Sequence, residues 1–527
     1  MGSPKHSAAD YWQNLKITSD DLQKLTSFLF EKEEPYTLDG LVQVLVAHRM
    51  ETLALEAEFQ AEEAGQLYYP RNTYPVGAKL IFPELDWKTG VVTAERAGNN
   101  PDLGSFTVSS VLIDGQQQDF ATNLESHPLN ESNYQQLGAD KQDAETILQV
   151  YGPEIKARLK SALSNQKELI RIGYTWFPKS LLMDIGKGEL NLAEAILDGQ
   201  AGGPMPIGEL LSQLEIVTDD ENKKLAEFSL NYALQEDPRF DEVGTSGQFS
   251  WFLKRLEPAS VLDVPAYLRL SVSPASLDGF SEEAKKIFSG LDDEQAFDET
   301  DFDEAKRANR ASVVLTYPHW RTGSLPITPS TFQVFPSALE TSHVRIVFKD
   351  EQTGVRIPAW VVRQGKYVIG LKDWYEDQNL IPGSIVEIGA TSEADVITIK
   401  PEKKRSNKEW IKTVLVGADG GIVFALLRQS ISAGFNERMA IAIPDVAGLD
   451  EVWKQREGKN INLKTDLIRM MNELSKLNNQ RHVHFMDLYA AMNVIRRTPP
   501  QNLLQLLGEG AEFAHVGDFY FHLVENN

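Results

Sequence analysis

The sequence has no cysteine among its 527 residues. This absence excludes a disulfide scaffold, a cysteine nucleophile and thiolate-bound zinc or iron–sulfur clusters. The sequence also lacks an apolar leader near its start, and no apolar run approaches the roughly 18 residues that a membrane-spanning helix requires. We therefore expect a chain that works in the cytoplasm and has no membrane partner.

Basic residues are scarce relative to acidic ones. The chain has 52 lysine and arginine residues against 76 aspartate and glutamate residues, which gives a formal net charge of −24. Such a chain repels bulk nucleic acid unless its positive charge is gathered locally. Hydrophobic residues make up 42% of the sequence, which is enough for folded cores. The length predicts roughly three or four domains.

The predicted secondary structure of the N-terminal part of the chain changes twice. Apolar residues at helical spacing predict helices over 10–65, with cap residues within Ile17-Thr18-Ser19-Asp20. The alternation in Lys79-Leu80-Ile81-Phe82 and the turn signal Asp114-Gly115 predict a small SH3-like β-barrel over 68–125. Helical spacing returns over 138–200, where we expect a helical domain.

Residues 280–304 are the clearest candidate linker. They contain ten acidic and two basic residues, a net of −8 and one third of the charge of the whole chain. A run of this kind is usually solvated and disordered. We expect an acidic linker here, with an acidic interaction segment held inside the chain as the alternative.

One sequence pattern occurs twice. Phe240 and Phe513 are each followed, after two further residues, by Val-Gly, a short polar turn and an aromatic strand. Both patterns come after helical segments that open with a short apolar piece. This order predicts a winged helix, in which a helix pair leads into a two-stranded wing whose turn uses glycine. The alternative is a helix-to-hairpin junction in an unrelated fold.

The first copy of this pattern carries further features of a known family. They are Met205-Pro206-Ile207 before Glu209-Leu210-Leu211, then Asp237-Pro238-Arg239-Phe240, Val243-Gly244 and Trp251. On these residues the segment 204–258 resembles the HARE-HTH family, the winged-helix module of the acidic delta subunit of bacterial RNA polymerase. Residues 481–523 are similar but shorter, and residues 20–50 match only the helical half. The resemblance implies association with transcription or chromatin through protein or nucleic-acid contacts, without catalysis.

Residues 311–400 are rich in predicted strands and resemble a second family. The features are the strand Val344-Arg345-Ile346-Val347-Phe348, Trp360, Gly370 before Trp374-Tyr375, and Leu380-Ile381-Pro382-Gly383-Ser384. On these residues, 325–400 resembles a B3-type DNA-binding pseudobarrel, although Ser384 stands where the family pattern has aspartate. The resemblance implies that barrel-edge loops read bases in the major groove while arginine and lysine contact phosphates.

The charge of this region supports a nucleic-acid interface. Residues 311–412 contain 13 basic and 11 acidic residues, a local net of +2. The candidate phosphate contacts are Arg345, Arg356, Arg363, Lys366, Lys403, Lys404, Arg405 and Lys408. The alternative is a small β-barrel with a solvated basic edge.

Catalytic and metal-binding motifs are weak. Ile443-Pro444-Asp445 and Glu457-Gly458-Lys459 match the short pattern of metal-dependent nucleases, but polar residues flank Glu457 where a buried strand is needed. His482 and His484 share one side of an extended strand, without a carboxylate at a recognisable ligand spacing. We expect no catalytic residue, no bound metal and no cofactor.

The sequence thus predicts a multidomain α+β protein with repeated winged-helix modules, an SH3-like barrel and a B3-like pseudobarrel. We expect a basic segment with mixed helices and strands over 401–460, and a C-terminal winged helix over 461–527. The first functional hypothesis is a non-enzymatic protein that binds DNA, or RNA polymerase and other transcription proteins. The alternatives are a protein–protein adaptor built of acidic winged helices and a metal-dependent nuclease.

Overall fold

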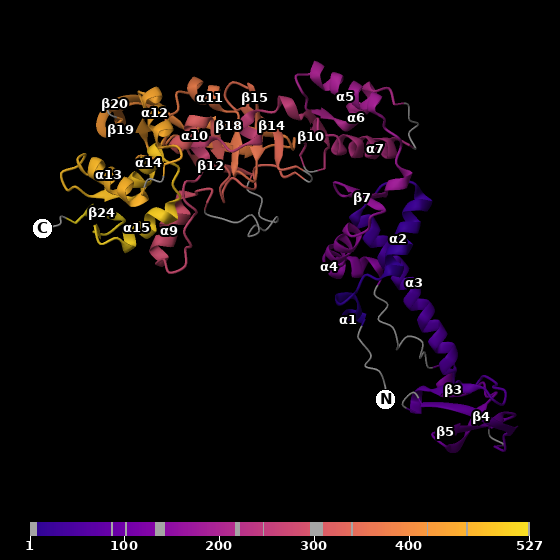
Figure 1. Cartoon of the computed structure of the whole chain (residues 1–527). Helices are drawn as coiled ribbons and strands as arrows, with labels where there is room; N and C mark the ends of the chain where they lie inside the picture. The colour runs from indigo at the N-terminus through magenta and orange to yellow at the C-terminus, as the bar shows by residue number, and fades with distance from the viewer. Residues whose placement is uncertain are drawn as a thin grey trace. The chain divides into compact units, whose positions relative to one another are not determined.

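The computed structural model describes residues 8–85, 88–100, 103–131, 143–216, 222–245, 247–295, 309–338, 341–418, 420–459 and 462–524. The chain folds into two compact units, Met1–Leu182 and Met183–Asn527, and each contains both helices and β-sheets (Figure 1). The prediction of a multidomain protein of mixed helices and strands is confirmed. Within the described ranges, every helix is too short or too polar to span a membrane.

The first unit begins with the helices that the sequence predicts over 10–65. The second of them starts at Thr18, whose hydroxyl accepts a hydrogen bond from the Asp21 amide (3.3 Å), while the Asp21 carboxylate accepts one from the Thr18 amide (2.7 Å). This reciprocal cap satisfies amide groups that have no partner inside the helix. The helices of this unit are α1 (Ala8–Gln13), α2 (Ser19–Lys32), α3 (Leu38–Ala64) and α4 (Ala144–Ser164).

The expectation of a helical domain over 138–200 is wrong in its centre. There β7 (Leu169–Ile172) and β8 (Thr175–Pro178) form a hairpin, and β8 also pairs with β1 (Tyr36–Thr37). These strands are rich in β-branched and aromatic side chains, and Gly173 between them has a φ of 58°, which suits a tight turn.

The core of this unit is built from two stretches that are distant in the sequence. Buried apolar residues between positions 12 and 46 pack with buried apolar residues between positions 147 and 176. The first part of 138–200 therefore completes the core of 10–65. Its last part, α5 (Lys187–Gly199), belongs to the second unit, and residues 138–142 lie outside the described ranges.

A five-stranded sheet is inserted between α3 and α4, in the order β2-β3-β4-β5-β6. Asp114 and Gly115 have φ angles of 49° and 79°, so the predicted turn is a two-residue hairpin loop with positive φ at both positions. The Leu124 amide donates to the Pro70 carbonyl (2.8 Å), which brings the end of the sheet back toward its start around a small core. The strands are β2 (Gln66–Leu67), β3 (Lys79–Phe82), β4 (Lys88–Ala97), β5 (Thr107–Ile113) and β6 (Gln116–Thr122).

The two segments that carry the repeated pattern have the same order of elements. Phe240 and Phe513 each begin a strand, and the Val-Gly pair that follows lies in the next turn, as the sequence predicts. After α5 come β9 (Met205–Pro206), α6 (Ile207–Gln213), α7 (Lys223–Glu236), β10 (Phe240–Glu242) and β11 (Ser250–Leu253). After α13 (Leu463–Ser475) come β22 (Val483–His484), α14 (Phe485–Ile495), α15 (Pro500–Glu509), β23 (Phe513–His515) and β24 (Tyr520–Leu523).

The first unit contains this order a third time. A helix, a strand, two helices and two strands follow one another there, with the five-stranded sheet inserted between the two helices. In all three segments the last strand lies between the other two. Trp176, Trp251 and Phe521 occupy the same register position, opposite the first residue of the first strand, and all three are buried. The sequence pattern predicts two of these three segments and only the helical half of the third.

A strongly curved, nearly closed sheet of seven strands occupies residues 310–401, in the order β12-β17-β18-β14-β15-β16-β13. Every strand contributes buried apolar side chains to one core, and the four strands predicted between 344 and 388 all belong to this sheet. Its elements are β12 (Arg310–Val314), α10 (Tyr317–Thr322), β13 (Ser324–Pro326), β14 (His343–Asp350), β15 (Arg356–Val362), β16 (Tyr367–Ile369), α11 (Lys372–Asp377), β17 (Ile385–Ala390) and β18 (Val396–Pro401).

The region 401–460 mixes strands and a helix, as expected. A long antiparallel hairpin of β19 (Lys403–Val416) and β20 (Ile422–Ala433) is followed by β21 (Ile441–Ala442), which pairs in parallel with β19, and by α12 (Val446–Arg456). The shorter elements of the chain are η1 (Pro83–Leu85), η3 (Pro128–Asn130), η5 (Lys179–Leu181), η6 (Lys254–Leu256), α8 (Ala259–Leu262) and η7 (Ala266–Leu268).

The expectation of a solvated linker over 280–304 is wrong for its described part. The amphipathic helix α9 (Glu282–Leu291) packs apolar side chains into the core that also contains the C-terminal helices. Asp293 and Glu294, directly after this helix, are 3% and 6% exposed. The remaining residues, 296–304, lie outside the described ranges.

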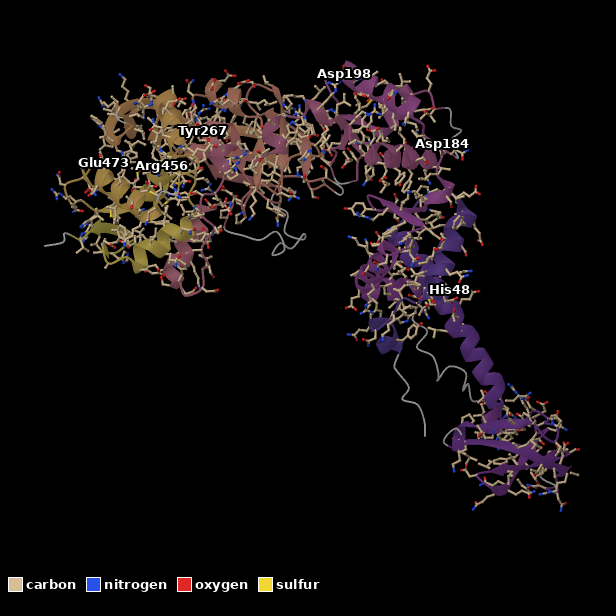
Figure 2. All side chains as sticks on the ribbon, viewed as in Figure 1. His48, Asp184, Asp198, Tyr267, Arg456 and Glu473 are labelled. Carbon is tan, nitrogen blue, oxygen red and sulfur yellow. The ribbon has the colours of Figure 1, made fainter. Side chains whose placement is uncertain are left out.

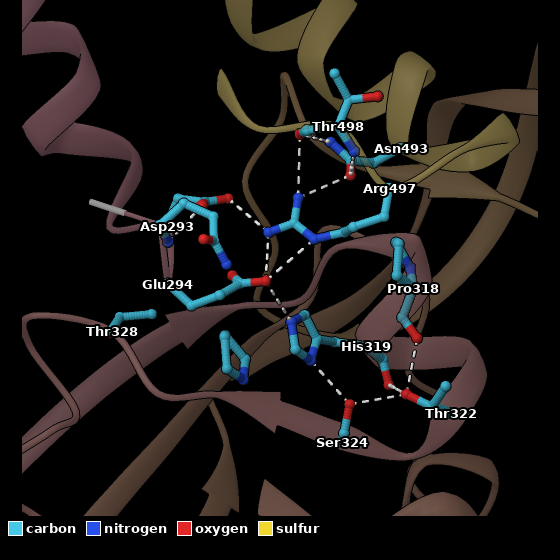
Figure 3. A network of polar contacts seen from close by, with 12 residues as sticks. Asp293, Glu294, Pro318, His319, Thr322, Ser324, Thr328, Asn493, Arg497 and Thr498 are labelled. Carbon is cyan, nitrogen blue, oxygen red and sulfur yellow. Dashed lines mark hydrogen bonds and ion pairs between the residues drawn. The ribbon is translucent and has the colours of Figure 1, made fainter. Parts of the chain in front are cut away.

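One buried guanidinium compensates these two carboxylates, as Figure 3 shows. Arg497 Nη2 lies 3.0 Å from Asp293 Oδ2, and Arg497 Nε donates to Glu294 Oε1 (3.1 Å). His319 Nε2 lies 3.3 Å from the same Glu294 oxygen, and the Tyr489 hydroxyl donates to Asp293. Burial raises the pKa of Asp293; burial also acts on Glu294, but Arg497 and His319 hold its pKa below the usual range.

Replacing Arg497 with methionine leaves two buried carboxylates without their cation. Removing one partner of a buried ion pair costs about 3–5 kcal/mol. We therefore expect Arg497→Met to lower the free energy of unfolding of the second unit by about that amount, measured by denaturant unfolding with tryptophan fluorescence. As a control, Arg255→Met removes an exposed ion pair with Asp198, which Figure 2 labels, and such pairs contribute about 1 kcal/mol or less. Equal losses in the two variants would contradict this account.

Candidate nucleic-acid interface

The register of the β19–β20 hairpin decides which side chains share a face. Residues directly opposite each other in an antiparallel pair lie on the same side of the sheet. Trp410 is opposite Arg428, and Lys412 is opposite Leu426. Lys408 precedes Trp410 by two positions and lies on the same side. We call Lys408, Trp410 and Arg428 the basic face of the hairpin.

The basic face exposes an aromatic ring between two cations. Trp410 is 64% exposed, and the guanidinium carbon of Arg428 lies 5.7 Å from its ring centroid. Large aromatic side chains are mostly buried, so an open tryptophan beside cations is typical of a binding surface. Sequence analysis missed Trp410 and Arg428. The available signal was a tryptophan among the polar residues that follow the lysine cluster, but the sequence does not say whether such a ring is covered.

Four of the predicted contacts, Lys403, Lys404, Arg405 and Lys408, lie in β19 at the open end of the hairpin. Lys403 and Lys408 are exposed, while Lys404 Nζ lies 4.0 Å from the Phe435 ring centroid and 3.4 Å from Glu409. The side chain of Arg405 falls outside the described part of the chain. From position 403 to 438 the sequence has seven basic and three acidic residues, so positive charge is concentrated here in a chain of −24.

Two of the predicted contacts in the seven-stranded sheet are engaged within the fold. The guanidinium carbon of Arg345 lies 4.9 Å from the Trp360 ring centroid, and burial lowers its pKa. Arg363 donates through Nη2 to the Phe335 carbonyl (2.8 Å). Both guanidinium groups therefore support packing between segments of the second unit.

The other two predicted contacts lie elsewhere on the same sheet. Arg356 is exposed, and its Nη2 lies 3.4 Å from Glu393. Lys366 has a φ of 56° in the turn before β16, and its carbonyl accepts a hydrogen bond from the Ile327 amide (2.8 Å). The structure thus brings together the contacts predicted in β19, and the register does not place the four barrel residues on the basic face.

A cleft of about 460 Å³ opens beside the basic face, between the hairpin and the C-terminal segment. Its lining includes Trp410, Lys412, Arg438, His482, His484 and Tyr520. Binding sites commonly combine a few polar groups with aromatic walls in this way. The cations and rings of this cleft suit a planar or anionic group.

A buried ion pair fixes the floor of the cleft. Lys412, which is 9% exposed, contacts the Asp487 carboxylate and donates to the Arg438 carbonyl. Burial lowers the pKa of Lys412, and Asp487 opposes this effect. Arg438 Nη1 lies 3.6 Å from Asp487, and its Nη2 donates to the Tyr520 hydroxyl (3.0 Å). Lys412 is therefore an anchor, and Arg438 is the cation that borders the open space.

His484 is a neutral wall of the cleft. Its Nδ1 accepts a hydrogen bond from the Met486 amide (3.1 Å) at the start of α14, so the neutral ring carries its proton on Nε2. Burial, followed by the charge of Arg438, lowers the pKa of His484 from 6.5 to about 4. The ring of His482 stacks on that of His522 at 5.6 Å.

The residues of the nuclease pattern do not form a common site. Asp445 caps α12, since its Oδ1 accepts from the Gly448 amide (2.9 Å), and Glu457 follows the other end of the same helix. Eleven helical residues separate them, which corresponds to about 16 Å. One Mg²⁺ cannot bridge that distance.

The protein-family models, curated proteins and solved structures that were compared with this chain include no match to it.

The lowered pKa of His484 predicts a fold that weakens in mild acid. The unfolded chain takes up this proton near pH 6.5, whereas the folded chain resists it until about pH 4. The stability that depends on neutral His484 is therefore complete above pH 6.5 and is lost as the pH falls toward 4. His484→Asn keeps a capping side chain but cannot be protonated. We expect the free energy of unfolding to fall more steeply over this range in the wild type than in His484→Asn; parallel curves would contradict the assignment.

Proposed function

We propose that this chain is a non-catalytic DNA-binding protein of the cytoplasm, which contacts DNA through the β19–β20 hairpin. The observation that carries the proposal is the exposed Trp410 between Lys408 and Arg428 on one face of the hairpin. The absence of cysteine supports a reducing compartment.

Each part of the hairpin has a distinct role in this proposal. The lysine cluster at the start of β19 and the cations of the basic face attract phosphates and release counterions, so affinity falls steeply with salt. The indole of Trp410 stacks on a base. Stacking needs a free base surface, and we therefore propose single-stranded or locally opened DNA as the ligand. The acidity of the remaining chain limits the contact to this region.

The family resemblances extend the proposal to partners. We propose that the three segments with a common topology are winged helices of the HARE-HTH type, and that the seven-stranded sheet is a B3-like barrel. The shared order of elements and strands supports the first assignment, and seven strands with two short helices support the second. RNA polymerase or another transcription protein is then the proposed partner of the acidic segments. The engagement of Arg345 and Arg363 within the fold favours the hairpin over the barrel as the DNA contact.

A protein–protein adaptor is the second candidate, and one observation favours it. On the opposite face of the hairpin, Leu415 and Val423 pair across the strands and Leu427 lies on the same side. These three apolar side chains are 40–47% exposed. Exposed apolar groups gathered on one face are typical of protein interaction sites.

Removing the charge at the start of β19 tests the phosphate contacts. We expect the combined variant Lys403→Ala, Lys404→Ala and Arg405→Ala to bind a fluorescent single-stranded oligonucleotide at least about tenfold more weakly at low salt. Each lost contact also flattens the slope of log affinity against log salt by about 0.7, or about 2 for all three. Fluorescence anisotropy over a salt series measures both quantities.

A matched variant separates a local contact from net charge. Lys286→Ala, Lys349→Ala and Lys454→Ala remove the same charge from exposed positions elsewhere in the second unit. This control should retain the wild-type affinity and slope. If both triple variants bound the oligonucleotide equally weakly, the proposed contact would be contradicted.

Trp410 tests base stacking separately from charge. We expect Trp410→Ala to weaken single-stranded DNA binding by about 1–3 kcal/mol, roughly 5- to 150-fold, with an unchanged salt slope. Trp410→Phe keeps an aromatic surface and should retain most of the affinity. Duplex DNA offers no free base surface, so its binding should change little. Wild-type affinity in Trp410→Ala would rule out stacking.

A further inference from the structure

Three potential metal ligands meet at a point that the DNA-binding proposal does not use. Asp241 lies in β10, Glu257 follows η6, and His343 begins β14. One ligand atom from each lies within 4.8 Å of the other two. Within the described ranges, they are the one cluster in which three such residues approach so closely. Their wide spacing in the sequence hid this cluster from motif analysis.

Two distances within the cluster match the spacing of ligand atoms around one zinc ion. His343 Nε2 lies 3.3 Å from Asp241 Oδ2 and 3.3 Å from Glu257 Oε1. Ligand atoms about 2.0 Å from a tetrahedral zinc ion are about 3.3 Å apart. One Nε2 proton cannot point at two carboxylates at once, whereas one ion can contact all three groups.

Glu257 supplies an independent indication of a missing partner. Its side chain is fully buried. The second carboxylate oxygen, Oε2, is among the buried polar atoms that have no hydrogen-bond partner. A buried carboxylate oxygen without a partner is costly, and a bound cation removes that cost.

The surroundings hold the three ligands in place. The Arg345 amide donates to the Val243 carbonyl (2.8 Å), which ties β14 to the turn after β10. The rings of Phe252 and Trp360 pack edge to face at 5.2 Å across the same contact. Ser342 Oγ lies 3.2 Å from Nδ1 of His343. A hydrogen bond at Nδ1 orients an imidazole whose Nε2 binds metal.

We propose that Asp241, Glu257 and His343 bind one Zn²⁺ ion through one oxygen of Asp241, both oxygens of the Glu257 carboxylate and Nε2 of the histidine, with water completing the coordination. Imidazole with carboxylates suits zinc, whereas Mg²⁺ and Ca²⁺ prefer oxygen ligands alone. Asp241 is 20% exposed, which leaves a path for the ion and the water. The ion joins the segment that contains β10 to the seven-stranded sheet, so it stabilises the docking of these two parts of the second unit.

Zinc binds a neutral imidazole and ionised carboxylates, so protons compete with the ion for these ligands and binding is stronger at higher pH.

Zinc titration of the full chain tests the site. The chain is stripped with a chelator, dialysed and titrated with ZnCl₂ in a calorimeter. We expect one ion per chain and a higher melting temperature in its presence. His343→Asn and Asp241→Asn should each weaken binding at least about 100-fold, because even the loss of a group that only orients a ligand costs 10- to 100-fold.

A second histidine near a carboxylate provides the control. His48, labelled in Figure 2, lies 3.9 Å from Asp20 in the first unit, and His48→Asn should bind zinc like the wild type. Circular dichroism shows whether each variant is folded, and Asp241→Asn, at the partly exposed ligand, keeps the test open if His343→Asn does not fold. Absence of stoichiometric zinc uptake in the wild type, or unchanged uptake in a folded ligand variant, would overturn the proposal.

Discussion

The buried guanidinium of Arg497 holds together parts of the second unit that are far apart in the sequence. Its partners Asp293 and Glu294 lie 204 and 203 residues away, and His319 adds the helix α10 to the same network. A charge inside a protein is tolerated only when its partners are in place. The acidic segment, the seven-stranded sheet and the C-terminal helices must therefore assemble together, and an excess of negative charge that looks like a solvated run becomes part of the core.

This constraint reaches the proposed DNA contact through α14. Arg497 is the second residue after that helix, and Tyr489 within it donates to Asp293. Asp487, two residues earlier in the same helix, holds Lys412 in β19, two positions after Trp410. The hairpin is thus anchored in the core beside Trp410, while Trp410 and its neighbouring cations stay exposed. An anchored hairpin presents its exposed side chains in a defined arrangement, which lowers the entropic cost of binding.

Sequence patterns predicted the features that neighbours in the chain decide, such as a helix cap within Ile17-Thr18-Ser19-Asp20, the turn at Asp114-Gly115 and the junctions after Phe240 and Phe513. These patterns failed where residues distant in the sequence determine whether a side chain is buried or exposed. The composition of the acidic segment predicts that Asp293 and Glu294 are solvated, because no residue near them in the sequence identifies Arg497 as their partner. The third copy of the repeated topology matched only in its helical half, because a five-stranded sheet separates that half from its last two strands. The local excess of basic residues identified the lysines of β19 as candidate contacts. The exposure of Trp410 and the internal contacts of Arg345 and Arg363 depend instead on strand register and packing.

Photo-crosslinking tests most directly whether the hairpin is the DNA contact. The full chain is irradiated with a single-stranded oligonucleotide that carries iodouracil, and the crosslinked peptides are mapped by mass spectrometry. The account predicts crosslinks within β19 and β20, with Trp410 as the principal site, because its ring is exposed and positioned to stack on a base. Crosslinks confined to the seven-stranded sheet or to the three repeated segments, with none in the hairpin, would contradict it.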